Sequence, residues 1–327
     1  MNKDFILSIC IPTYNRAKEL DQALYSILMS HHNSNLIEIC ISDNASEDNT
    51  YQIVNKFIEK GMNIKYSCSK NNEGADKNFL RVIEMSTAQY CWFLGSDDLV
   101  KSNSIKMILD LIDEKAFDII LFNRDEVSID GQFLKSTRWF EAVGEFDLSK
   151  KNERYDYLNS VTALGGVFSY ISSIVFRRKL WNSSESYNQF INTNYIHVAK
   201  LLDMIKNGAQ LKSISESIVD CRINFGINTF HGSLGEYKRL YIDFYYLMIT
   251  CQIFGFDSKE YELIFHILKK ERNLKSLLSI KYKLNKEDSV SLYQLLKNSG
   301  FLKEYIIVMF FPKKVLSFLF FLKKLFF

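Results

Sequence analysis

The stretch FILSICIPTYNRAKELDQALYSIL, residues 5–28, contains two hydrophobic patterns in succession. Its first seven residues are mostly apolar, which is typical of a buried strand, and Pro12 ends the run. Apolar side chains then recur at the spacing of one helical face, at Leu20, Ala23, Leu24, Ile27 and Leu28. The stretch therefore predicts a strand over residues 5–11 and a helix over residues 16–30.

The same order of strand and helix repeats along the first part of the chain. Further strands are predicted at residues 37–42, 63–67, 89–94 and 117–123. Helices are predicted between them at residues 50–60, 76–86 and 102–114. Strands that alternate with helices of this length indicate an α/β fold with a mostly parallel sheet and right-handed crossovers.

Polar side chains follow four of the predicted strands where each strand ends. The four clusters are Pro12–Asn15, Asp43–Asn44, Asn72–Gly74 and Asp97–Asp98. In open parallel sheets, ligands bind at the carboxyl ends of the strands. We therefore expect the four clusters to form one binding site at that edge of the sheet.

Charge and composition limit the partners of the chain. Its 327 residues are 47% hydrophobic and 24% charged, as in an ordinary folded protein. Five lysines and one glutamate give residues 301–327 a charge of +4, and the whole chain carries +3. The remaining 300 residues therefore sum to −1, which argues against nucleic acid as a partner. Six cysteines without a CxxC pair indicate reduced thiols and a cytoplasmic protein.

The last part of the chain has a different pattern. Residues 231–300 are expected to be a helical region, because Tyr, Leu and Ile recur at helical spacing. Pro312 divides the basic, apolar tail 301–327, in which eight residues between two lysine pairs are too few to span a bilayer. We expect a helix at the interface of an anionic membrane; the alternative is a helix docked on the protein.

The four polar clusters stand in sequences that resemble a known family. LSICIPTYNRAKELDQALYSIL, ISDNASEDNT, NNEGADKNF and WFLGSDDLV are similar to the N-terminal half of family 2 glycosyltransferases of the GT-A type, which has a Rossmann-like sheet flanked by helices. GVFSYISSIVFRRKLW, NYIHVAKLL and DCRINFGINTF further resemble the abequosyltransferase-like branch, whose members add dideoxyhexoses during O-antigen assembly. The resemblance implies a catalytic domain over residues 1–230, with a nucleotide-sugar half (1–125) and an acceptor half (126–230).

The resemblance also implies the substrates. The donor would be a sugar, here a 3,6-dideoxyhexose, on CDP, UDP or dTDP, and the acceptor a hydroxyl of a lipid-linked oligosaccharide. The enzyme would be peripheral on the inner face of the bacterial cytoplasmic membrane. The residues expected to bind the nucleotide sugar are Pro12, Thr13, Tyr14, Asn15, Asp43, Asn44, Asn72, Gly74, Lys77, Asn78, Asp97 and Arg222.

Asp97 and Asp98 occupy the position at which the family binds a divalent cation. Carboxylates suit Mg²⁺ or Mn²⁺, which would neutralise the charge on the departing nucleoside diphosphate. The usual pattern has three acids, D-x-D-D, but Gly95 stands in place of the first. Which of the two acids would hold the metal and which would contact the ribose is left open. A turn that caps the next helix is the structural alternative.

The catalytic base also departs from the family pattern. Many inverting members carry a Glu-Asp pair where this chain reads NTNYIHVAKLL, so His197 is the first candidate and Asp203 the second. Histidine, with an ordinary pKa of about 6.5, is a competent base at neutral pH; the alternative for His197 is a core histidine. Arg222 is expected to contact the diphosphate, or else to be a surface arginine.

Two other functions remain open at this point. A sugar-nucleotide pyrophosphorylase uses a similar fold, but it expects a Gly-rich basic loop after the first strand, and PTYNRAKEL is not one. A non-catalytic, carbohydrate-binding relative would also explain the missing first acid and the missing Glu-Asp pair.

Overall fold

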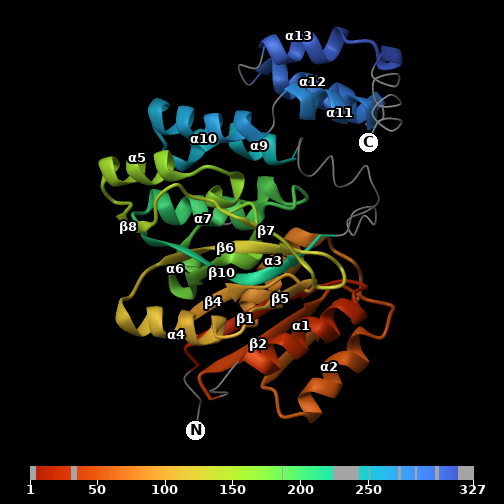
Figure 1. Ribbon diagram of the computed structural model, residues 1–327, viewed down its shortest axis with the longest axis vertical. Helices are drawn as coiled ribbons and strands as arrows, with labels where there is room; N and C mark the ends of the chain where they lie inside the picture. The colour runs from red at the N-terminus through yellow and green to blue at the C-terminus, as the bar shows by residue number, and fades with distance from the viewer. Residues whose placement is uncertain are drawn as a thin grey trace. The chain divides into compact units, whose positions relative to one another are not determined.

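The computed structural model describes residues 5–30, 35–185, 187–223, 243–249, 251–271, 274–283, 286–298 and 302–315. The chain divides into two compact units, Met1–Phe225 and Gly226–Phe327 (Figure 1). The predicted boundary between residues 230 and 231 lies outside the described residues, and the predicted division at 125/126 falls inside a strand.

The first unit is built on one sheet, to which its described residues contribute ten strands. Their order across the sheet is β3-β2-β1-β4-β9-β6-β10-β5, with β7 paired to β6 and β8 paired to β10. The strands are β1 (Leu7–Thr13), β2 (Ile37–Asp43), β3 (Ile64–Cys68), β4 (Tyr90–Phe93), β5 (Asp98–Val100), β6 (Ile119–Val127), β7 (Phe133–Thr137), β8 (Gly144–Asp147), β9 (Ile174–Arg177) and β10 (Gln210–Arg222).

The five predicted strands run in one direction. β1 is parallel to β2 and to β4, and β2 is parallel to β3. β9 lies antiparallel between β4 and β6, so β6 again points the same way as β4. The prediction of an α/β fold with a mostly parallel central sheet is confirmed. The antiparallel direction of β9 was not predicted, because a four-residue apolar run does not indicate which way a strand runs.

Helices cover both faces of this sheet. They are α1 (Ala17–Ser30), α2 (Thr50–Glu59), α3 (Ala75–Glu84), α4 (Ser104–Glu114), α5 (Lys151–Ser160), α6 (Arg178–Ser183) and α7 (Ile196–Lys206). Short 3-10 turns lie at Leu164–Val167, Ile171–Ser173 and Asn188–Phe190. The predicted helices at residues 16–30, 50–60, 76–86 and 102–114 correspond to α1 to α4, each within two residues at either end.

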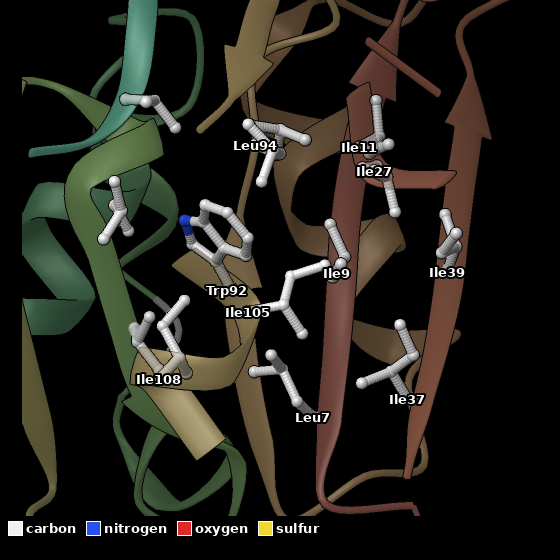
Figure 2. Close-up of a cluster of buried hydrophobic side chains, with 14 of the residues drawn as sticks. Leu7, Ile9, Ile11, Ile27, Ile37, Ile39, Trp92, Leu94, Ile105 and Ile108 are labelled. Carbon is white, nitrogen blue, oxygen red and sulfur yellow. The ribbon is translucent and has the colours of Figure 1, made fainter. Parts of the chain in front are cut away.

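Successive residues of the central strands face opposite sides, and each side has its own helices. Figure 2 shows Ile9 of β1, Ile39 of β2 and Trp92 of β4 in one buried cluster, together with Ile27 from α1 and Ile105 from α4. The intervening strand residues belong to the other face, where Phe79 of α3 packs edge-on against Phe93 of β4. Burial on both faces explains why the central strands are mostly apolar on both sides.

The second unit is helical where the structure describes it. Its helices are α9 (Phe244–Ile249), α10 (Ser258–Glu271), α11 (Leu274–Lys283), α12 (Lys286–Asn298) and α13 (Leu302–Phe310), with a 3-10 turn at Cys251–Phe254. The Lys281 ammonium donates hydrogen bonds to the carbonyls of Val308 (2.5 Å), Met309 (2.7 Å) and Phe311 (2.9 Å). This buried lysine closes the end of α13, whose last carbonyls have no partner within the helix. Residues 316–327 of the predicted tail lie outside the described residues.

Candidate functional site

The carboxyl ends of β1 and β2 lie side by side. Thr13 and Asp43, the last residues of these strands, are paired in the parallel register. The Asn44 N–H donates to the Thr13 carbonyl (3.0 Å), and the Asn78 amide reaches the same carbonyl (3.2 Å). The predicted clusters after β1 and β2 and the start of α3 therefore meet at one edge of the sheet.

Asp43 is 1% exposed and organises this edge. Its Oδ1 atom accepts the Ser46 N–H (2.8 Å), and its Oδ2 atom accepts the Tyr66 hydroxyl (2.7 Å). Burial of Tyr66, with the adjacent Asp43 carboxylate, raises the pKa of the tyrosine, so its proton stays on the phenol. Asp43 thus fixes the loop after β2, and any bond to a nucleobase would use its remaining lone pairs.

The loop before α3 is held to the loop after β2 by asparagine side chains. The Asn44 amide donates to Asn72 Oδ1 (2.7 Å), and Asn44 Oδ1 accepts the Glu73 N–H (2.9 Å). Gly74 then adopts a φ of 88°, a left-handed conformation that favours glycine, and α3 begins at the next residue. Asn72 therefore holds this loop with its side chain, and Gly74 shapes it with its backbone.

The predicted nucleotide residues differ in exposure. Tyr14, 39% exposed, and Asn15 face solvent after β1, whereas Pro12 and Thr13 are buried. Lys77 is exposed on α3, with its ammonium 3.6 Å from a Glu73 oxygen. Tyr14, Asn15 and Lys77 can reach a ligand directly, and the buried residues support them.

A hollow of about 320 Å³ lies beside this edge, and none of the residues predicted to bind the nucleotide sugar lines it. It is lined by Ser67, Cys68, Ser69, Lys70, Asn71, Glu73 and Arg81. The Ser69 N–H donates to the Asp43 carbonyl (2.9 Å), so the hollow adjoins the end of β2. Among the described residues, the buried Ser69 Oγ and Arg81 Nη1 atoms find no hydrogen-bond partner. The run of Ser, Lys and Asn after β3 was the available signal.

Asp97 and Asp98 converge above Gly95. A Cβ atom placed on Gly95 would lie 2.8 Å from Asp98 Oδ2 and 3.1 Å from Asp97 Oδ1. The two carboxylates therefore fill the space that an acidic side chain at position 95 would need. Glycine at position 95 has no side chain, so it leaves room for the carboxylates of Asp97 and Asp98.

Asp98 is the more enclosed of the two acids. It is 4% exposed, and its Oδ2 atom accepts the Ser172 hydroxyl (2.5 Å), whose oxygen accepts the Gly95 N–H (2.8 Å). Burial, and then the negative charge of Asp97, raises the pKa of Asp98 to about 6. A cation bound between the two carboxylates would relieve the repulsion between their negative charges.

The secondary structure that follows Asp97 rules out the alternative that the two acids cap the next helix. Asp98 begins β5, opposite Cys221 of β10, and α4 starts only at Ser104, with Asn103 at its N-cap position. No cluster of three His, Cys, Asp or Glu side chains suited to a metal occurs among the residues that the structure describes. The donor set fits a cation such as Mg²⁺ held by one or two carboxylates, with substrate phosphates and water as the other ligands.

Two arginines surround Asp97. Arg222 donates through Nε to the Asp97 carbonyl (2.5 Å), and it also bonds the Gln22 side chain and the Glu19 carbonyl. Its predicted contact with the diphosphate stays a prediction. Arg16, which was not predicted, lies with Nη1 2.9 Å from Asp97 Oδ2. It follows the PTYN segment directly, and that adjacency was the signal available in the sequence.

His197 and Asp203 lie inside the protein, on α7. The His197 side chain is 1% exposed, and its ring packs edge-on against Phe79 (5.3 Å between centroids) and Phe93 (6.2 Å). Asp203 accepts the Tyr187 hydroxyl (2.5 Å) and the Asn207 amide (3.1 Å). The structure brings neither side chain to the strand-end surface, so their catalytic roles stay predictions.

Comparison with known proteins identifies the family. The model of glycosyl transferase family 2 matches residues 8–181. The chain is 32% identical over 273 residues to the abequosyltransferase RfbV of Salmonella typhimurium strain LT2, covering 82% of this chain and 81% of that protein. The chain belongs to glycosyl transferase family 2 and is an enzyme of the transferase class. The family resemblance seen in the sequence is confirmed.

Solved structures show the same fold. S. aureus TarS 1-349 in complex with UDP superposes with a TM-score of 0.66 at 18% identity, covering 93% of this chain and 81% of that chain. The mannosyltransferase PcManGT from Pyrobaculum calidifontis, in complex with GDP-Man and Mn²⁺, gives a TM-score of 0.56 at 12% identity, covering 97% of this chain and 84% of that chain. These likenesses confirm the GT-A fold.

Proposed function

We propose that the chain transfers a sugar from a nucleoside diphosphate to a hydroxyl of a lipid-linked oligosaccharide in O-antigen or surface polysaccharide synthesis, with inversion at the anomeric carbon. The convergence of Asp97 and Asp98 above Gly95, at the strand ends that ligands occupy in such sheets, is the observation that carries this proposal. The relation to an abequosyltransferase over most of both chains supports a 3,6-dideoxyhexose as the sugar.

The nucleotide would lie along the carboxyl ends of β1, β2 and β3. Tyr14 offers an exposed ring to the base, and the hollow beside Asp43 offers hydroxyl, amide and guanidinium groups. CDP, UDP and dTDP all remain candidates, because a carboxylate can accept from uracil or thymine N3–H and from the cytosine amino group alike. Gly74 ends the loop before α3, and Lys77 lies in the first turn of that helix. Both residues would lie near the ribose and the phosphates.

Asp97 and Asp98 would hold a divalent cation, Mn²⁺ or Mg²⁺, as their geometry and mutual repulsion favour. When bound, the cation would neutralise the charge that develops on the departing nucleoside diphosphate. Arg222 would keep the Asp97 backbone fixed against α1. Ser172 would orient Asp98 toward the same point.

His197 is the proposed base, with Asp203 as the second candidate. In an inverting displacement, the base takes the proton of the attacking hydroxyl while the bond from the sugar to the diphosphate breaks. Because Phe79 and Phe93 cover the His197 ring, the acceptor would have to open that contact to reach it. A role for His197 therefore requires movement of α3 or α7 when substrates bind.

Membrane contact would bring the enzyme to a lipid-linked acceptor at the inner face of the cytoplasmic membrane. The helix α13 exposes Ile306, Ile307, Met309 and Phe310, the last with 72% of its surface accessible. Lys303, Lys313 and Lys314 are exposed on either side of them. Exposed apolar side chains between lysines suit an anionic lipid interface. No helix in the described part of the chain is long and apolar enough to cross a bilayer.

The experiment is a transfer assay with defined components. The full chain is incubated with CDP-, UDP- or dTDP-sugars, a lipid-linked oligosaccharide and Mn²⁺, and mass spectrometry follows the acceptor. The proposal expects the acceptor to gain one sugar and the nucleoside diphosphate of that donor to be released. It also expects the Asp98→Asn variant to be inactive. Nucleotide binding without any transfer would contradict it. So would formation of a nucleotide sugar in a parallel incubation with a nucleoside triphosphate and a sugar 1-phosphate.

A further inference from the structure

Arg16 contacts the carboxylate that is proposed to bind the cation. Its Nη1 atom lies 2.9 Å from Asp97 Oδ2, and the two side chains are 15% and 30% exposed. The ion pair is thus half-buried but still reachable from solvent. Asp98 differs, because it is enclosed and bound to the Ser172 hydroxyl. Of the two acids, Asp97 is the one whose present partner a ligand can replace.

The backbone on both sides of Arg16 is fixed. The Asn15 N–H donates to Ser46 Oγ (2.8 Å), and the Ala17 N–H donates to Asp48 Oδ2 (2.8 Å). Asn15 Oδ1 in turn accepts the Glu47 N–H (2.8 Å). These bonds pin the turn after β1 to the loop after β2. Any movement of the Arg16 guanidinium must therefore come from its long side chain, with no change of the loop.

Arg222 has a different set of contacts. Its guanidinium bonds the Asp97 carbonyl, the Gln22 side chain and the Glu19 carbonyl, so three protein groups fix it in place. It contacts the backbone of Asp97, whereas Arg16 contacts the carboxylate. Arg222 therefore positions the loop, and Arg16 neutralises the charge.

A guanidinium and a divalent cation compete for one carboxylate, because each is attracted to its oxygens and the two cations repel each other. A nucleoside diphosphate removes the conflict. It brings oxygens that can accept from the guanidinium in a bidentate fashion and that can also bind the metal.

We propose that Arg16 is the counter-ion of Asp97 until the donor arrives, and that its guanidinium then moves to the donor's diphosphate while Asp97 turns to the cation. The inference rests on the proposed function of the site. It makes the binding of cation and nucleotide cooperative: the cation alone binds poorly, and it binds well only with the nucleotide.

The test measures binding, with the full-length chain. Mn²⁺ alone is titrated by electron paramagnetic resonance, and CDP, UDP and dTDP are titrated by calorimetry in saturating Mn²⁺. In Arg16→Gln, we expect Mn²⁺ alone to bind about fivefold more tightly, since its competitor is gone, and the nucleotide to bind about tenfold more weakly. Arg16→Lys, which keeps the charge but cannot form the bidentate bond, should restore the weak binding of Mn²⁺ alone and only part of the nucleotide affinity.

Arg177→Gln is the matched control. Arg177 forms an ion pair of the same length with Asp118 (2.9 Å), with side chains 25% and 20% exposed, and it lies at the far end of β9 from Ser172. Its removal should leave both affinities within twofold of wild type. Thermal unfolding of each variant checks that the fold is retained.

The outcomes separate this inference from the proposed function. Binding of a nucleotide by the wild type, with Arg16→Gln matching Arg177→Gln in both titrations, would overturn the counter-ion role and leave the donor site intact. Weaker binding of Mn²⁺ alone in Arg16→Gln would also overturn it, because removal of a competing guanidinium cannot weaken Mn²⁺ binding. Failure of the wild type to bind any nucleotide would overturn both.

Discussion

The carboxylate of Asp76, on α3, accepts a hydrogen bond from the backbone N–H of Ile196, the first residue of α7, over 3.0 Å. Its second oxygen accepts the Asn194 N–H (2.8 Å). The start of one helix thus caps another helix more than a hundred residues later, where N–H groups have no partner within the helix. The contact joins α3, in the predicted nucleotide-sugar half, to the helix that carries His197.

Replacement of Asp76 should loosen this junction. The Asp76→Ala variant leaves the buried Ile196 N–H and the partly buried Asn194 N–H without their acceptor, so we expect a loss of about 1–3 kcal/mol in the free energy of unfolding. Urea denaturation measures it, and Asp113→Ala, an exposed aspartate on α4, is the control. Equal stability of the two variants would contradict a capping role for Asp76.

Restoring an acid at position 95 should harm the site. A side chain there meets Asp98 Oδ2 at 2.8 Å and Asp97 Oδ1 at 3.1 Å, so Gly95→Asp adds both a clash and a third negative charge. We expect Mn²⁺-dependent nucleotide binding to weaken by at least about tenfold, and Gly95→Ala to weaken it less. Calorimetry in the presence of Mn²⁺ measures the nucleotide affinity of each variant. Tighter nucleotide binding by Gly95→Asp than by the wild type would contradict the steric explanation.

Glu38 gives a pH-dependent prediction far from the site. Burial opposes ionisation of Glu38, but hydrogen bonds from Lys65, Ser8 and the Thr87 backbone outweigh it and lower the pKa of this carboxyl. A lowered pKa gives stability that is complete above the unfolded-state pKa of about 4.3 and is lost as the pH falls through the folded value.

Glu38→Gln should therefore destabilise the protein by about 2–4 kcal/mol at pH 7, because charge-assisted bonds inside the protein are lost. The difference between variant and wild type should shrink as the pH falls below about 4. Urea unfolding at pH 7, 5 and 3.5 tests this. A difference that stays constant with pH would show that the carboxylate charge contributes nothing.

The apolar side chains of α13 give a prediction for membrane binding. Ile307→Ser combined with Phe310→Ser removes two of its exposed apolar groups, and we expect flotation with phosphatidylglycerol vesicles to fall by at least about half. Tyr25→Ser combined with Met29→Ser, which changes two exposed apolar residues of α1, should leave flotation unchanged. Self-association of the wild type without vesicle binding would instead indicate contact between copies of the chain.

The elements that the sequence predicted are those with local signals. α1 to α4 and the central strands follow from apolar periodicity, which arises from burial on one helical face or on both faces of a strand. β7 and β8 carry mainly exposed or half-buried residues, and β5 has three residues, so no such pattern marks them. Polar residues after consecutive strands predicted that these clusters meet at one edge of the sheet, and the ends of β1 and β2 do so.

The finer features of the site depend on contacts across the fold. The pairing of Arg16 with Asp97 joins residues 81 positions apart, and the space above Gly95 is defined by side chains that follow it. The enclosure of His197 depends on rings from α3 and β4. No pattern within a single segment records such contacts, so only the assembled structure reveals them.

The most direct test of the account is calorimetric titration of CDP, UDP and dTDP, each with and without Mn²⁺, into the wild type and into the variant with Asp97→Asn and Asp98→Asn. We predict that one nucleotide binds the wild type only with Mn²⁺ present, and that the variant loses this binding. Binding that is indifferent to Mn²⁺ and to both carboxylates, or no binding of any nucleotide, would contradict the proposed donor site.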